Sequence, residues 1–105
     1  MRALSWTVEE RGQAIRVKLA GELDISSAGD LEGELKRIEG RQPERVVLDL
    51  SEVRFMDSTG LRLVVTADDR ARKGGWRLSV VPGPEAVQRV FRITRLEERL
   101  EFEKD

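Results

Sequence analysis

Near the start of the chain, apolar and polar residues alternate at every second position, which is the repeat of a half-buried strand. Residues 14–20, AIRVKLA, place Ile15, Val17 and Leu19 on one face and charged residues on the other. Residues 4–8 can pair with this segment as a hairpin across the turn EERGQ. The pattern therefore predicts a strand over residues 14–20 with a hairpin partner before it.

The period changes in SSAGDLEGELKRIEG, where apolar residues recur at every third or fourth position. These positions are Ala28, Leu31, Leu35 and Ile38. Ser27 and Asp30 form a candidate capping box, with Asp in place of the usual Glu or Gln, and Gly40 supplies a stop. The pattern predicts an amphipathic helix.

RVVLDL, residues 45–50, is a continuous apolar and β-branched run, which is typical of a central strand covered by helices. We interpret the next residues, SEVRFM, as a short connection. Residues 58–73 have the helical period again, and Gly74 and Gly75 can take the left-handed conformation in which many helices end. The apolar positions of this second helix are Leu61, Val64, Val65 and Ala71.

WRLSVV, residues 76–81, predicts another strand, and Pro84 suits the first position of a third helix over EAVQRVFRIT. The tail can end in a short strand around residues 100–102 or in a frayed helix, and its charges allow either. No internal repeat or Pro/Ser-rich linker divides the chain. We therefore expect residues 1–105 to form a single α/β domain.

The composition limits the functions that the chain can have. It is 39% hydrophobic and 37% charged and has no long apolar segment, which is typical of a soluble protein without a membrane span. The opening MRALSWTVEE lacks the apolar core of a secretory signal, so we expect a cytoplasmic location. Lys and Arg total 19 against 20 for Asp and Glu, so neither nucleic acid nor a membrane is favoured as a partner.

One stretch interrupts the apolar pattern. In FMDSTGLRL, bulky apolar residues flank a group of four residues that are polar or small: Asp57, Ser58, Thr59 and Gly60. They fall at the predicted start of the second helix, where four backbone amides lack partners within the helix. We interpret Asp57 as the cap, with the two hydroxyl residues in the first turn and the glycine permitting close packing. One capping side chain would suffice, and the surplus of hydroxyls beside Met56 and Leu61 indicates a surface for a protein partner.

A hydroxyl at a helix start can also act as a switch. The helix dipole and free amides would favour a phosphate there, while its charge would repel Asp57 and any acidic or apolar surface docked on it. A catalytic serine is disfavoured, because the chain has no histidine base, no GxSxG elbow and no Walker-type loop. Cysteine is absent too, which removes thiolate nucleophiles and thiolate metal sites. We expect no enzymatic activity, no cofactor and no metal.

The stretch VVLDLSEVRFMDSTGLRLVV resembles the signature of the STAS domain, the module of bacterial anti-sigma factor antagonists and of the cytoplasmic ends of sulfate transporters. LAGELDISSAGDLEGEL is similar to the family's Gly-Glu-Leu-Asp turn and first helix, and LSVVPGPEAVQRVFRITRLEERLEF to its last strand and closing helix. The resemblance covers residues 8–102. It implies a small mixed β-sheet of four or five strands with helices packed mainly on one face.

The resemblance also implies a regulatory cycle. In antagonists of this kind, the dephosphorylated domain binds an anti-sigma factor and frees the sigma factor to join RNA polymerase. The anti-sigma factor, a serine kinase of the histidine-kinase-like ATPase fold, phosphorylates the antagonist and ends the interaction, and a serine phosphatase resets it. The resemblance thus implies a bacterial phosphoprotein that regulates transcription through protein–protein contacts.

The phosphoacceptor implied by the resemblance is Ser58, which follows the Asp of the family's Asp-Ser-Ser/Thr-Gly motif. Asp24, in GELD, matches an acid near the acceptor that helps to form the partner surface, with a turn or cap residue as the equal alternative. Arg62 stands where many members have Gly or another small residue. It can pair with a phosphate or an acidic partner, or be an ordinary exposed helix arginine. The residues expected to bind the partner are Asp24, Asp57, Ser58, Thr59, Gly60, Leu61 and Arg62.

Other functions and assembly states stay open. The match to the family also departs from its usual residues at two other positions. Ser27 stands where Thr is usual, and Arg95 stands where Gly is usual. One alternative function is a STAS scaffold or signalling-assembly subunit in which Ser58 is never modified. Another is a STAS module that senses a small anion or nucleotide at the amide-rich start of the second helix. The domain can be a monomer or can dimerise through an apolar patch around Met56 and Leu61.

Overall fold

The computed structural model describes residues 3–103, which form a four-stranded mixed sheet in the order β1–β2–β3–β4. The strands are β1 (Leu4–Arg11), β2 (Ala14–Leu23), β3 (Arg45–Met56) and β4 (Arg77–Val81). β1 runs antiparallel to β2, whereas β2, β3 and β4 run parallel to one another. The expected hairpin and mixed sheet are confirmed, and β1 extends beyond residues 4–8.

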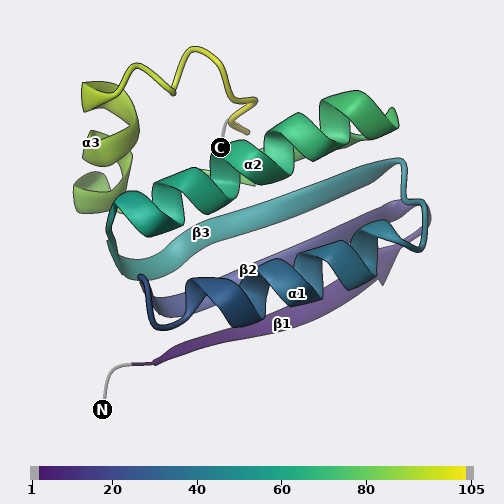
Figure 1. Ribbon diagram of the computed structural model, residues 1–105, viewed down its shortest axis with the longest axis horizontal. Helices are drawn as coiled ribbons and strands as arrows, with labels where there is room; N and C mark the ends of the chain where they lie inside the picture. The colour runs from purple at the N-terminus through teal and green to yellow at the C-terminus, as the bar shows by residue number, and fades with distance from the viewer. Residues whose placement is uncertain (1–2, 104–105) are drawn as a thin grey trace.

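Three helices lie on one face of this sheet, as expected (Figure 1). They are α1 (Ala28–Glu39), α2 (Ser58–Gly74) and α3 (Glu85–Ile93). α1 and α2 run along the strands, and α3 stands beside the start of α2. Within residues 3–103, no helix has both the length and the apolar character needed to cross a membrane. The side chains that fill the core between helices and sheet include Leu19, Leu23, Leu31, Leu35, Ile38, Leu48, Leu50 and Phe91.

The prediction that residues 51–56 form a short connection is wrong, because β3 continues through them to Met56. These residues pair with the end of β2, and Leu23 lies opposite Met56. Two register shifts along the β2–β3 ladder interrupt the two-residue alternation. Val53 and Met56 are therefore both buried although they lie three positions apart. A pattern in which buried and exposed residues strictly alternate therefore does not reveal residues 51–56 as part of the strand.

The starts of the helices also differ in part from expectation. Ser27 precedes α1, but the predicted capping box with Asp30 is wrong, because the Ser27 side chain makes no capping bond to the helix. Its hydroxyl instead donates to the carbonyl of Glu22 at 2.9 Å and accepts from the amide of Asp24 at 3.0 Å. Pro84 lies one position before α3 instead of forming its first residue.

The ends of the helices use two backbone conformations. α2 ends at Gly75, whose φ of 87° is the predicted left-handed conformation, whereas Gly40 ends α1 with a right-handed backbone. α3 ends in a Schellman motif in which Arg95, with a φ of 62°, occupies the left-handed position. The amide of Leu96 then donates to the carbonyl of Phe91 at 2.9 Å. A non-glycine residue is strained at that position.

Of the two alternatives for the tail, the structure has the one that resembles a strand. Phe102 forms a single parallel bridge with Val80 of β4. The amide of Val80 donates to the carbonyl of Glu101 at 2.8 Å, and the amide of Glu103 donates to the carbonyl of Val80 at 2.8 Å. The ring of Phe102 also packs edge-on against Phe91, with the ring centroids 5.2 Å apart. The tail thereby holds α3 against the sheet.

The prediction that β3 is covered by helices holds for one face only, and charged side chains cover the other. Asp49 of β3 is 2% exposed and accepts hydrogen bonds from the guanidinium of Arg16 at 2.7 Å and the amide of Ser51 at 2.9 Å. Burial acts to raise the pKa of Asp49, but the hydrogen bonds from Ser51 and the charge of Arg16 outweigh it and leave the pKa below its usual value. Other ion pairs of the strands and tail are Lys18–Glu52, Arg45–Glu103 and Arg77–Glu101.

Candidate functional site

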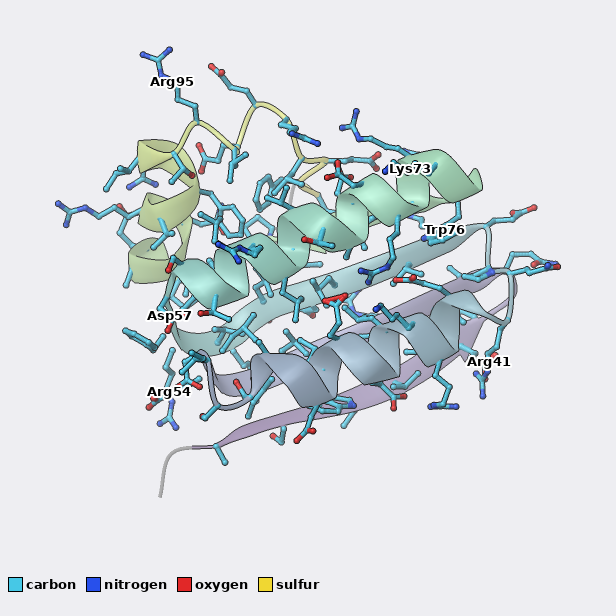
Figure 2. All side chains as sticks on the ribbon, viewed as in Figure 1. Arg41, Arg54, Asp57, Lys73, Trp76 and Arg95 are labelled. Carbon is cyan, nitrogen blue, oxygen red and sulfur yellow. The ribbon has the colours of Figure 1, made fainter. Side chains whose placement is uncertain are left out.

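Two loops meet at the edge of the sheet where β2 and β3 end. These strands are parallel, and Leu23 and Met56 form the last pair of their ladder. The next residue on each strand is an acid, Asp24 on one and Asp57 on the other. The amide of Asp57 donates to the carbonyl of Leu23 at 3.3 Å. The GELD and MDSTG motifs are therefore neighbours in space, and Figure 2 shows Asp57 at this end of the molecule.

Asp57 is the N-cap of α2, as predicted. Its Oδ1 accepts hydrogen bonds from the amides of Thr59 at 2.9 Å and Gly60 at 3.3 Å. These bonds satisfy two of the free amides and place negative charge at the positive end of the helix dipole. Because the carboxylate already uses these amides, the start of α2 is a poor site for a small anion. The anion-sensing or nucleotide-sensing alternative loses its main support.

Ser58 is the first residue of α2 and is exposed. Its hydroxyl makes no hydrogen bond to any residue in the described range 3–103. Thr59 is half-buried by comparison. The Ser58 hydroxyl is thus exposed to other proteins, and a group added to it displaces no hydrogen bond among the described residues.

Asp24 is held in a tight turn between β2 and α1. Its Oδ1 accepts from the amide of Ser26 at 3.0 Å and from the Ser26 hydroxyl at 2.6 Å, and its carbonyl accepts from the amide of Ala28 at 2.9 Å. The hydroxyl of Ser26 is the main cause that holds the pKa of Asp24 below its usual value. Oδ2 accepts no hydrogen bond from the part of the chain that the structure describes. Asp24 is therefore a turn residue. Its Oδ2 is available to a partner, and a role for Asp24 in binding stays a proposal.

The apolar neighbours of Ser58 differ from expectation. Met56 is 5% exposed and lies in the core, so the predicted surface patch around Met56 and Leu61 is wrong in its first member. Leu61 is half-buried and packs against the core. Gly60 is buried too, and a Cβ there would lie 2.6 Å from Cγ of Met56 and 2.9 Å from the carbonyl oxygen of Leu23. Gly60 therefore serves close packing and presents no surface to a partner.

Two exposed apolar side chains at this edge were not predicted. Ile25 is 80% exposed and Phe55 is 47% exposed. Ile25 follows Asp24 in the turn, and Phe55 lies opposite Glu22 near the end of β3. Adjacent residues of a strand point to opposite faces, so Phe55 is exposed where Met56 takes the buried face. The pairing with β2 decides which of the two is buried. We name the loop edge as the surface formed by Asp24, Ile25, Phe55, Ser58 and Arg62.

Arg62 lies one helical turn after Ser58 and is exposed on α2. Its guanidinium makes no hydrogen bond or ion pair with residues 3–103. It lines a shallow groove of about 230 Å³ between α1 and α2, together with Thr59, Leu63 and Gly29. The loop edge therefore combines exposed apolar groups with a free cation and a free hydroxyl, as protein-binding surfaces often do.

The sequence was compared with models of protein families and with the sequences of known proteins. The sequence model of a family described as "Mlab, STAS domain" matches residues 6–101. An "Anti-sigma-B factor antagonist" of Bacillus subtilis (strain 168) is 32% identical over 95 residues, which cover 90% of this chain and 86% of that protein.

The fold is shared with solved structures of antagonists. The crystal structure of an anti-sigma factor antagonist from Mycobacterium paratuberculosis has a TM-score of 0.84 and 23% identity, covering 98% of this chain and 87% of that one. The anti-sigma factor antagonist SpoIIAA in its unphosphorylated form has a TM-score of 0.81 and 17% identity, covering 96% and 90%. Its phosphorylated form, described as a Bacillus cell fate determinant, has a TM-score of 0.74 and 16% identity, covering 96% and 93%.

Proposed function

The chain belongs to the STAS domain family, and we propose that within this family it is an anti-sigma factor antagonist switched off by phosphorylation of Ser58. The Bacillus subtilis relative carries the name of an antagonist, and SpoIIAA has been solved both without and with phosphate. In this chain, the proposal rests on one observation. Ser58 presents an exposed hydroxyl at the start of α2, directly after the capping acid, and this hydroxyl makes no hydrogen bond with residues 3–103.

In the proposed cycle, the unphosphorylated loop edge binds an anti-sigma factor and frees its sigma factor. The anti-sigma factor is a serine kinase of the histidine-kinase-like fold, and a serine phosphatase reverses its action. A phosphate on Ser58 adds about −1.5 to −2 charges beside the carboxylate of Asp57 and the apolar side chains of Ile25 and Phe55. Such charge opposes an interface in which these side chains lose their water, so the complex separates.

The proposed contact residues are those at the loop edge together with Asp57, Thr59 and Leu61. Gly60 supports them from below, because its lack of a side chain lets α2 approach Leu23 and Met56. The protein is a substrate of the kinase in this scheme, and no chemistry is assigned to its own side chains.

The test is incubation of the chain with ATP and a candidate anti-sigma factor kinase, followed by mass spectrometry of the products. We expect one phosphate on Ser58, none in Ser58→Ala, and unchanged phosphorylation in Thr59→Ala, which removes the neighbouring hydroxyl. Ser58→Asp should weaken binding to that anti-sigma factor at least tenfold. If the anti-sigma factor binds without adding phosphate and ignores Ser58→Asp, the chain is a constitutive scaffold and the switch is refuted.

A further inference from the structure

Arg62 differs from most basic side chains of the described chain in having no acidic partner. Those that form ion pairs are Arg16, Lys18, Arg37, Arg41, Arg45, Arg70, Arg72, Arg77, Arg92 and Arg99. The acids nearest to Arg62 along α2 and the groove are already engaged. Asp57 accepts hydrogen bonds from backbone amides of its own helix. Glu32, which lines the same groove, accepts a hydrogen bond from the guanidinium of Arg70 at 2.5 Å. The guanidinium of Arg62 is thus free to bind an acid from outside the fold.

The helix directs this free cation toward Ser58. Residues four apart on an α-helix are neighbours, with Cβ atoms about 5–6 Å apart. Helical side chains also tilt toward the N-terminus, so the side chain of Arg62 leans over the turn that begins with Ser58. A phosphate on Ser58 would add acceptor oxygens within reach of a guanidinium, which binds such groups with paired hydrogen bonds.

The same cation also faces the groove between α1 and α2. The groove is lined by Ala28, Gly29 and Leu63, with Arg62 and Glu32 as its charged members. Since Glu32 is paired, the net charge that the groove offers to a partner is the positive charge of Arg62. Charge complementarity therefore favours a protein partner that places a carboxylate there.

We infer that Arg62 is a shared cation, for which a carboxylate of the docked protein partner and the phosphate on Ser58 compete. The inference rests on the proposed function, whose regulation it specifies. In the unphosphorylated chain, Arg62 binds the partner's acid beside the apolar contacts of Ile25 and Phe55. After phosphorylation, the guanidinium of Arg62 pairs with the phosphate on its own helix. The partner then loses its ion pair with Arg62 and is also repelled by the charge of the phosphate.

The first test needs no kinase, because phosphoserine can be incorporated at position 58 during translation. The pKa of that phosphate is then measured by ³¹P NMR in the otherwise unchanged chain, in Arg62→Gln and in Lys73→Gln. Lys73 is a matched control, since it is exposed and lies on the same helix at the end opposite to Asp57 (Figure 2). A nearby cation favours the dianion, so Arg62→Gln should raise the phosphate pKa by about 0.3 unit. Lys73→Gln should leave it unchanged.

An unchanged phosphate pKa in Arg62→Gln, or an equal shift in Lys73→Gln, would overturn the inference. The second test measures binding of the unphosphorylated chain to the anti-sigma factor that phosphorylates it. Arg62→Glu should weaken this binding at least tenfold and Lys73→Glu less than twofold, and equal effects would refute the acidic contact. The two proposals can fail separately. Absence of any kinase that modifies Ser58 counts against the proposed function, whereas the phosphate pKa tests Arg62 alone.

Discussion

The backbone amide of Asp57 donates to the carbonyl of Leu23 across 3.3 Å, and this bond joins the start of α2 to the end of β2. It continues the parallel ladder by one step beyond the pair of Leu23 and Met56. Both loops of the site are therefore fixed to the same two strands. The backbone that carries the hydroxyl of Ser58 is therefore joined by this bond to the strand that leads into the other loop.

Loss of the α2 cap should destabilise the fold. Asp57→Ala removes an acceptor from the amides of Thr59 and Gly60, and the expected loss in the free energy of unfolding is about 1 kcal/mol. Asp57→Asn keeps an oxygen that can accept from these amides, so its loss in the free energy of unfolding should be smaller. Urea denaturation followed by circular dichroism measures both variants. Equal stability of Asp57→Ala and the unchanged chain would show that the cap contributes nothing.

Addition of one methyl group at Gly60 should destabilise the chain by about 1–3 kcal/mol, because overpacked cores lose this much. The new Cβ would meet Met56 and the backbone of Leu23 at less than 3 Å. Gly33 is the matched control, since it lies inside α1 and a Cβ added there would meet no atom of a neighbouring element within 4 Å. Gly33→Ala should stabilise by about 0.5–1 kcal/mol. Urea denaturation separates the two, and destabilisation of both would contradict the packing argument.

Arg95→Gly should stabilise the protein by about 0.5–1 kcal/mol, because glycine takes a positive φ without a steric penalty. Arg95 now holds the left-handed position after α3 with a φ of 62°. Arg89→Gly is the control, because Arg89 lies inside α3 and glycine there should destabilise by about 1 kcal/mol. Thermal unfolding of the two variants should shift in opposite directions. A lower melting temperature for Arg95→Gly would refute the strain.

Asp49 should make the stability depend on pH in the acidic range. Its pKa is lowered in the folded chain, so its contribution is complete above its unfolded pKa of about 3.9 and is lost as the pH falls through the folded pKa. Asp49→Asn should therefore destabilise by about 1–2 kcal/mol at pH 7, and the difference from the unchanged chain should shrink as the pH falls below the unfolded pKa of about 3.9. Glu52→Gln, which removes the exposed partner of Lys18, should change stability by less than about 1 kcal/mol. Urea denaturation between about pH 2 and pH 7 tests this, and a gap for Asp49→Asn that is independent of pH would contradict it.

Ile25 and Phe55 should contribute to partner binding and not to folding. Ile25→Ser and Phe55→Ser should each weaken binding to the anti-sigma factor by about 1–2 kcal/mol, as expected of central apolar contacts in an interface. Ile93 is 71% exposed on α3 and is the matched control. Ile93→Ser should leave binding unchanged in calorimetric titration. If all three variants bind alike, the loop edge is not the docking surface.

Much of the fold could be predicted from the sequence because helices and strands bury their apolar residues at regular intervals. α1 and α2 and the first half of β3 follow this rule. The second half of β3 does not, because two register shifts place Val53 and Met56 on the same buried face. Pairing between strands decides that register, and the sequence of one strand does not contain it.

The same register explains which parts of the site could be predicted. Ser58 and Asp57 occupy the start of α2 as their residue types indicate, since hydroxyls and acids favour helix starts. The prediction wrongly places Met56 on the surface and misses Phe55, because the faces of residues 51–56 depend on the pairing with β2. It misses Ile25 for another reason. Ile25 lies in a turn, where no periodicity tells whether an apolar side chain is covered.

The unbonded state of the Ser58 hydroxyl has a consequence for the lifetime of the protein. Attachment or removal of a group at this oxygen breaks no hydrogen bond with the described residues, so neither step requires the fold to open. Repeated cycles of modification would then leave the domain folded. The state of the switch could change many times within one molecule, and a cell would reset the signal without new synthesis.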